Sequence, residues 1–280
     1  MKKIHFLSTV LIIATVISCD NKAEEKPRPS TAESNVFVLE QHFKIAGLNR
    51  SRQIRVYLPP EYDSSEQHYP VLYMHDGQNL FDDSTSYVGE WGIDESLNQL
   101  AKESDFRLIV VGIDNGQEKR MNELSPWGNK KYGAAEGEAY MKFIVNQIKP
   151  YIDNKYRTLR DRDNTAIMGS SMGGLISHYA IYNYPQVFSK AGIFSPSYWY
   201  SEQVFSFTKD NPVPEDARLY LIIGKQEGNA VDDTEKMYAH ILNTGHPKNN
   251  LSMNVDSDGD HNESSWRKQF IPAIKWLFEQ

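Results

Sequence analysis

Short apolar runs separated by segments of helical periodicity constrain the fold of this chain more than any other feature. Four such runs cover residues 69–74, 107–113, 165–168 and 219–223. Runs this short and this continuous are typical of parallel strands that are covered on both faces. Strands that alternate with helices predict an α/β fold with a central, mostly parallel sheet flanked by helices.

Helical periodicity occupies the segments between and after these runs. Apolar residues recur at helical spacing within residues 93–102, 138–152, 232–242 and 264–278. Each segment is therefore expected to form a helix. Residues 36–46 and 52–58 instead alternate apolar and polar side chains, which predicts two half-buried strands before the first apolar run.

Composition indicates one large domain. The chain has 280 residues, of which 40% are hydrophobic, and this is enough to form a substantial core. No internal repeat or second linker divides the chain, so we predict a single domain over residues 36–280. A formal net charge of −7 argues against nucleic acid as a partner, because phosphate binding requires a basic surface.

The N-terminus has the pattern of a bacterial lipoprotein signal. Two lysines precede an apolar run, residues 6–17, which is too short for a membrane span. The run ends in "VISC", which resembles a lipobox whose cysteine is Cys19. We predict a signal peptide over residues 1–19, lipidation of Cys19 and a flexible polar tether over residues 20–35. The alternative is an ordinary secretory peptide with an incidental cysteine.

This signal has two consequences for the mature protein. A lipidated Cys19 would anchor the chain to a membrane of the bacterial cell envelope, facing the periplasm or the cell surface, and the lipid would be the only membrane contact. Cys19 is also the only cysteine, so no disulfide can form within the chain.

The stretch "GSSMGGL", which begins at Gly169, fits the motif G-x-S-x-G with Ser171 at its centre. An apolar run precedes the motif and a helical pattern follows it, which is the context that a nucleophile elbow requires. The turn is so sharp that side chains at Gly169 and Gly173 would collide. Ser171 is therefore the candidate nucleophile, and the alternative is a small-residue turn without chemistry.

A serine hydroxyl needs a base to accept its proton. In the fold that uses such an elbow, the chain order is serine, acid, histidine. His261 satisfies this order, because it lies in a loop between the strand-like residues 251–255 and the last helical segment. His178 falls on the helix directly after Ser171 and is expected to be packed or solvated there.

The acid is expected between Ser171 and His261, after a strand. Glu227 follows the apolar run 219–223 on a glycine-flanked loop, and it is the favoured partner of His261. Asp232 is the alternative acid. Asp232 or Asp233 could instead cap the helix that follows.

Two backbone N–H groups are expected to form the oxyanion hole. One belongs to Met172, directly after the serine, and the other lies near Gln78 or Asn79 in the loop after residues 69–74. Acidic residues and a histidine in that loop lack any recognisable zinc spacing. No metal and no organic cofactor is expected.

Five local signatures accompany the triad candidates, namely "RVYLPPEYD", "YPVLYMHDGQNLFDD", "GSSMGGL", "FSPSYWY" and "GDHNESSWR". Together they resemble an esterase branch of the α/β-hydrolases over residues 36–280. This branch includes the enterobactin-type, acetyl-xylan and feruloyl esterases, the S-formylglutathione hydrolases and the mycolyltransferases. The resemblance implies an α/β-hydrolase fold without a large lid, Ser171 as nucleophile, His261 as base and an oxyanion hole near Gln78. Members of the branch vary at the acid.

The function expected from these residues is a serine carboxylic-ester hydrolase that acts through an acyl-enzyme. Its substrate would be a carbohydrate acyl ester or a siderophore ester, and Tyr198 and Trp199 would line the rim of the pocket, unless they only pack there. Acyl transfer by the same triad is the alternative activity. A surface lipoprotein that only binds ligands is disfavoured, because both Ser171 and His261 are present.

Overall fold

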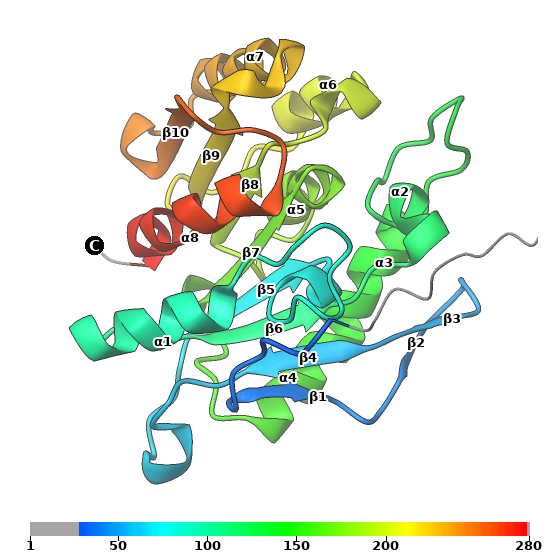
Figure 1. Cartoon of the computed structure of the whole chain (residues 1–280). Coiled ribbons are helices and arrows are strands. Elements are labelled where there is room, and N and C mark those ends of the chain that lie inside the picture. Colours follow the sequence, from blue (N-terminus) through cyan, green and yellow to red (C-terminus); the bar gives the residue numbers. More distant parts are fainter. Residues whose placement is uncertain (1–27, 279–280) are drawn as a thin grey trace, which may run out of the picture.

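The computed structural model describes residues 28–278, which fold around an eight-stranded sheet (Figure 1). The strand order is β1-β4-β6-β5-β7-β8-β9-β10. β4 is antiparallel to both of its neighbours, and every other adjacent pair in this sheet is parallel. The predicted α/β fold with a mostly parallel central sheet is therefore confirmed.

The strands of the main sheet are β1 (Val36–Val38), β4 (Ile54–Tyr57), β5 (Val71–His75), β6 (Ile109–Ile113), β7 (Thr165–Ser170), β8 (Lys190–Phe194), β9 (Arg218–Gly224) and β10 (Leu251–Asp256). A separate antiparallel pair consists of β2 (Phe43–Ile45) and β3 (Arg50–Arg52). The helices are α1 (Ile93–Glu103), α2 (Arg120–Glu123), α3 (Gly137–Phe143), α4 (Lys149–Lys155), α5 (Met172–Asn183), α6 (Gln203–Asp210), α7 (Asn229–Asn243) and α8 (Glu263–Phe278).

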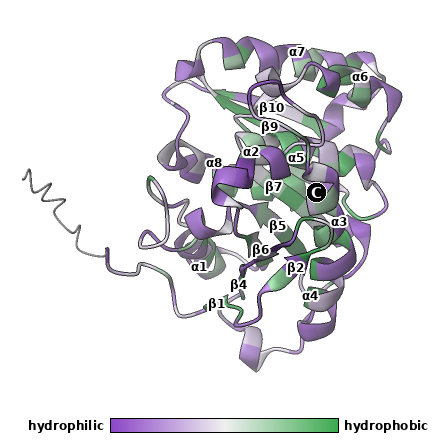
Figure 2. Cartoon of the chain, turned by 90° about the vertical axis from the view of Figure 1, so that its right-hand side faces the viewer, coloured by the Kyte–Doolittle hydropathy of each residue, from purple (hydrophilic) through white to green (hydrophobic). Residues whose placement is uncertain are grey.

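Side chains of the sheet bury two separate hydrophobic clusters, one on each face. Along β5, Val71 and Tyr73 join the cluster beneath α3 to α7, whereas Leu72 and Met74 join the cluster beneath α1 and α8. All four are fully buried, as expected for a central parallel strand. Hydrophobic strands lie at the centre of the molecule in Figure 2, and the outer helices are largely hydrophilic.

Two elements differ from the sequence-based expectation. The strand expected over residues 36–46 is broken, because the exposed polar residues 40–42 interrupt it and β2 then pairs with β3 instead of the main sheet. The helix expected over residues 138–152 is divided by a π-helical turn, Ile144–Ile148. Pro150 follows in the first turn of α4, and because proline lacks an N–H group it cannot continue regular helical hydrogen bonding.

The start of the described chain lies against the domain. Arg28 contacts Asp83, and the Ser30 hydroxyl donates to Asp82 at 2.8 Å. These contacts fall within residues 28–35, which the sequence pattern assigned to the flexible tether. The predicted signal peptide and Cys19 lie outside the described residues. Among residues 28–278, no helix is long and apolar enough to cross a membrane.

Candidate active site

Ser171 occupies a strained turn between β7 and α5. Its backbone has φ 60° and ψ −120°, a conformation that L-residues rarely adopt. A side-chain Cβ at Gly169 would lie 2.9 Å from the backbone of Gly173, so only glycine fits there. The sequence prediction of a sharp strand–serine–helix turn therefore describes the observed geometry.

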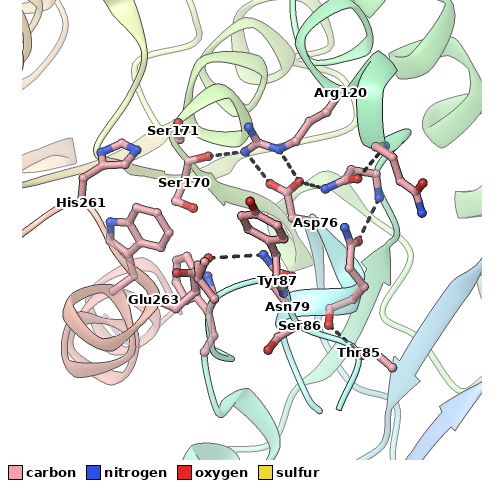
Figure 3. Close-up of a pocket in the computed structure, with 16 residues that line it drawn as sticks. Asp76, Asn79, Thr85, Ser86, Tyr87, Arg120, Ser170, Ser171, His261 and Glu263 are labelled. Carbon is pink, nitrogen blue, oxygen red and sulfur yellow. Dashed lines mark hydrogen bonds and ion pairs between the residues drawn. The ribbon is translucent and has the colours of Figure 1, made fainter. Parts of the chain in front are cut away.

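His261 lies in the loop between β10 and α8 and faces the same cleft as Ser171 (Figure 3). Its Nδ1 atom is 2.6 Å from Oε2 of Glu227. The other ring nitrogen is thus left to face the cleft. Within residues 28–278, the Ser171 hydroxyl makes its hydrogen bond with Ser197, at 3.2 Å, rather than with His261. A serine hydroxyl rotates freely, and such contacts often tighten only when substrate binds.

Glu227 is held rigidly behind His261. It ends the 3₁₀ turn after β9, and its side chain is only 2% exposed. Its Oε1 atom accepts from the Gly224 N–H at 2.8 Å and from the Ser195 hydroxyl at 2.6 Å. The indole of Trp266 in turn donates to Ser195 at 2.8 Å. Glu227 therefore offers its remaining oxygen to His261 in a fixed direction.

The loops that carry the acid and the histidine touch through two glycines. A Cβ at Gly224 would lie 2.4 Å from the carbonyl carbon of Gly259. The Gln226 N–H also donates to the Gly259 carbonyl at 3.1 Å. This approach is possible only because neither residue has a side chain. The end of β9 therefore lies beside the loop that carries His261.

Asp232, the alternative acid, lies in the first turn of α7. The carboxylate that contacts His261 is that of Glu227. Asp232 and Asp233 do not cap the helix either, because α7 already begins at Asn229.

Of the two predicted oxyanion donors, Gln78 lines the cleft, and Met172 directly follows Ser171, which also lines it. Met172 is the first residue of α5, and Gln78 lies in the 3₁₀ turn after β5. Within the described part of the chain, neither backbone N–H donates to a protein acceptor. The first N–H groups of a helix have no partner within it, so the Met172 N–H is free for an oxygen atom of a bound molecule.

An ion pair holds the Gln78 loop in place. The Asp76 carboxylate contacts Arg120 at 2.6 Å and 2.9 Å and accepts from Asn115 at 2.6 Å. Burial alone would raise the pKa of Asp76, but Arg120 and these hydrogen bonds outweigh burial and lower it. The Gln78 side chain also accepts from the Asn115 N–H at 3.0 Å. Sequence reasoning did not identify Arg120 or Asn115, because neither belongs to a recognisable motif.

The cleft in front of Ser171 has a volume of about 730 Å³. Its wall includes Tyr87, Trp91 and Trp266, none of which the sequence analysis assigned to the site. Tyr87 is 87% exposed, so its ring is free to contact a ligand. Glu263 also lines the cleft, where burial raises its pKa.

Tyr198 is not at the rim of the pocket, and this corrects the sequence-based prediction. It is only 1% exposed, and its hydroxyl bonds to Nδ1 of His178 at 2.9 Å. Tyr198 therefore belongs to the core, and His178 is packed rather than solvated. Trp199 is 53% exposed and lines a second hollow beside His261 and Glu227. Trp199 thus remains a candidate for substrate contact.

One family model and two curated relatives match this chain over most of its length. The model of a protein family described as "Putative esterase" matches residues 45–277. Uncharacterized protein YbbA of Bacillus subtilis is 28% identical over 242 residues, which cover 81% of this chain and 93% of that protein. An endo-1,4-beta-xylanase/feruloyl esterase of Xylanibacter ruminicola is 26% identical over 228 residues, or 80% of this chain and 29% of that protein.

A solved structure shares the fold. Enterochelin esterase from Shigella flexneri superposes with a TM-score of 0.71 at 18% sequence identity. The superposition covers 92% of this chain and 63% of that chain.

Proposed function

Because the chain belongs to this esterase family and is an enzyme that acts on carboxylic esters, we propose that it hydrolyses them through a triad of Ser171, His261 and Glu227. The contact of 2.6 Å between the buried Glu227 and His261, which lines the same cleft as the strained Ser171, carries this proposal. Glu227 fixes the orientation of the ring and lies next to the positive charge that the ring gains during the reaction, as the acid of a triad must.

The reaction proceeds through an acyl-enzyme. The Ser171 hydroxyl attacks the ester carbonyl carbon while Nε2 of His261 takes the hydroxyl proton. The negative oxygen that develops accepts hydrogen bonds from the N–H groups of Met172 and Gln78, each of which is worth about 3 kcal/mol in comparable sites. His261 then gives its proton to the departing alcohol, and water repeats the cycle on the acyl-enzyme.

Replacement of the serine tests this mechanism. With the purified full-length protein and p-nitrophenyl acetate, Ser171→Ala should lower kcat by about 10⁵-fold or more. Ser197→Ala is the matched control, because Ser197 is the hydroxyl nearest to Ser171 in the hydrogen-bond network. The control should retain activity within about tenfold of the wild type. Activity that survives in Ser171→Ala and is lost in Ser197→Ala would reject the assignment.

The aromatic wall of the cleft favours an ester with a planar aromatic acyl group, on a carbohydrate or a siderophore. Tyr87, Trp91 and Trp266 line the cleft, and Tyr87 is the exposed ring among the three. Aromatic rings attract other rings by stacking or edge contacts. The names of the feruloyl esterase relative and of the enterochelin esterase structure agree with this class. We expect a higher kcat/KM for methyl ferulate or a catecholate serine ester than for an acetylated glycan. Equal values for the three would contradict the preference.

Acyl transfer would use the same triad with an alcohol in place of water. The His261 side chain is 44% exposed, so water has direct access to the base, and this favours hydrolysis. The test is to measure the ratio of acid to transferred ester while an acceptor sugar is added. If the free carboxylic acid remains the main product at high acceptor concentration, the result supports hydrolysis.

We also propose that the enzyme acts at the bacterial cell envelope, anchored by a lipid on Cys19. The lipobox-like sequence "VISC" supports this localisation. Cys19→Ser should release the protein from the membrane fraction. A variant protein that stays with the membrane to the same extent as the wild type would contradict the anchor.

A further inference from the structure

Three carboxylates gather beside the wall of the cleft, at the start of α1. Glu90 comes from the loop before the helix, and Asp94 and Glu95 come from its first turn. One oxygen from each lies within 4.8 Å of the others. Asp94 is fully buried and Glu90 is 6% exposed. None of the three lines the cleft itself.

Each carboxylate leaves one oxygen without a partner. The Glu90 Oε1 atom accepts from the Thr31 hydroxyl and the Asp94 Oδ2 atom accepts from the Glu33 N–H, both at 2.8 Å. The remaining atoms, Glu90 Oε2, Asp94 Oδ1 and Glu95 Oε2, are buried and accept no hydrogen bond within residues 28–278. A buried acceptor without a partner is costly, and three in one cluster are unusual.

The surrounding charges do not balance the cluster. Within residues 28–278, the cation that contacts the cluster is Arg267 on α8, with Nη2 4.0 Å from Glu90 Oε1. Its hydrogen bonds go instead to the backbone carbonyls of Trp91 and Glu90, at 2.9 Å and 2.7 Å. Arg28 is paired with Asp83 at 3.1 Å. One guanidinium thus faces three carboxylates, and buried charges normally require partners.

We propose that Glu90, Asp94 and Glu95 bind a hard divalent cation, Ca²⁺ or Mg²⁺, through their unpartnered oxygens. Both ions are bound by carboxylate oxygens and by water. The cation would join the N-terminal segment, residues 28–35, to the loop that carries Tyr87 and to α1. Figure 1 shows this segment, in dark blue, passing beside that loop. The cation stabilises the loop and takes no part in the chemistry at Ser171.

The alternative occupant is a proton. Burial raises the pKa of Asp94 to about 8, so a proton shared between Asp94 and Glu95 would also neutralise part of the cluster. The two occupants are distinguished by the dependence of stability on added metal at constant pH.

Thermal unfolding of the full-length protein, first treated with EDTA and dialysed, provides the test at pH 7.5. Saturating Ca²⁺ or Mg²⁺ should raise the Tm of the wild type by about 5 °C. The ion that gives the larger shift is the preferred one, and calorimetric titration should give one site per chain. Asp94→Asn should abolish the shift, because the amide keeps the contact with Glu33 but removes the charge.

Glu103→Gln is the matched control, because Glu103 ends the same helix, and it should keep the full shift. Glu95→Gln provides a second variant if Asp94→Asn fails to fold. A wild-type Tm that neither ion changes would overturn the proposal in favour of the proton. A shift of equal size in the wild type and in both site variants would overturn it as well, because the ion would then bind elsewhere.

Discussion

The two walls of the cleft are built in different ways. One, the catalytic wall, consists of Ser171, Ser195, Glu227 and His261 at the ends of β7 to β10. Its reactive groups are positioned by neighbouring parallel strands and by the buried Glu227 carboxylate. The other, the loop wall, consists of residues 82–91, and its Tyr87 is 87% exposed.

The loop wall is fixed from outside the sheet. Polar contacts join it to the N-terminal segment, residues 28–35, for example between Ser30 and Asp82 and between Thr31 and Glu90. This difference separates two tasks. In the proposed mechanism, the catalytic wall needs fixed geometry for a reaction common to all esters, whereas the loop wall is proposed to contact the acyl group.

The largest expected effect concerns the acid of the catalytic wall. Glu227→Gln should lower kcat by about 10⁴-fold, because the amide no longer holds the His261 ring in the correct tautomer and orientation. Asp232→Asn should leave kcat close to that of the wild type. Steady-state kinetics on one ester checks both variants, and the reverse pattern would transfer the acid to Asp232.

Low pH should reduce the free energy of unfolding through His178, which is buried on α5. Burial lowers the pKa of His178 to about 3, whereas an unfolded histidine titrates near 6.5. The unfolded chain therefore binds the additional proton, and stability is lost as the pH falls from about 6.5 toward 3. His178→Gln should reduce this loss by about 1.4 kcal/mol per pH unit, measured by urea unfolding. His42→Gln, at an exposed site, should leave the slope unchanged, and an equal change in both would refute the assignment.

A smaller effect is expected at Ser195, whose hydroxyl donates a hydrogen bond to Glu227. Ser195→Ala removes a hydrogen bond to Glu227 and leaves the Trp266 indole unpartnered, so kcat should fall about tenfold with little change in KM. Ser189→Ala is the control, since Ser189 is also buried and precedes the same strand, β8. If both variants lose activity equally, Ser195 affects activity only through the stability of the fold.

The smallest effect should come from the loop wall. Tyr87→Ala should raise KM for an aryl ester by about threefold to tenfold and leave kcat unchanged, since a ring contact is worth about 0.5–1.5 kcal/mol. Tyr198→Phe should leave KM unchanged and lower the free energy of unfolding by about 1 kcal/mol, because it loses the bond to His178. A raised KM in Tyr198→Phe alone would restore Tyr198 to the substrate site.

Ser171 in the catalytic wall could be predicted from the sequence because its signals are local. Short apolar runs specify strands, and the glycines around Ser171 specify a turn that few sequences allow. The end of β9 and the expected chain order favoured Glu227 as the acid but left Asp232 open. Ser195 carries no such signal, because its role depends on Glu227 and Trp266, which are distant in the sequence.

The loop wall could not be predicted for a related reason. Acidic residues in the first turn of a helix are common, because they complement the helix dipole, so Asp94 and Glu95 look ordinary in the sequence. Residues 28–35 are polar and lack periodicity, which is also the pattern of a linker. Tyr198 and Trp199 are adjacent aromatic residues in a 3₁₀ turn, and only the folded turn determines which of them faces the core.

The exposure of His261 also affects how protons move through a catalytic cycle. In the proposed mechanism, the ring passes the serine proton to the departing alcohol and then takes a proton from the water that attacks the acyl-enzyme. Because the imidazole is 44% open to solvent, this water can arrive from the medium without a channel through the protein. Water thus acts as a co-substrate that the surroundings supply at constant concentration.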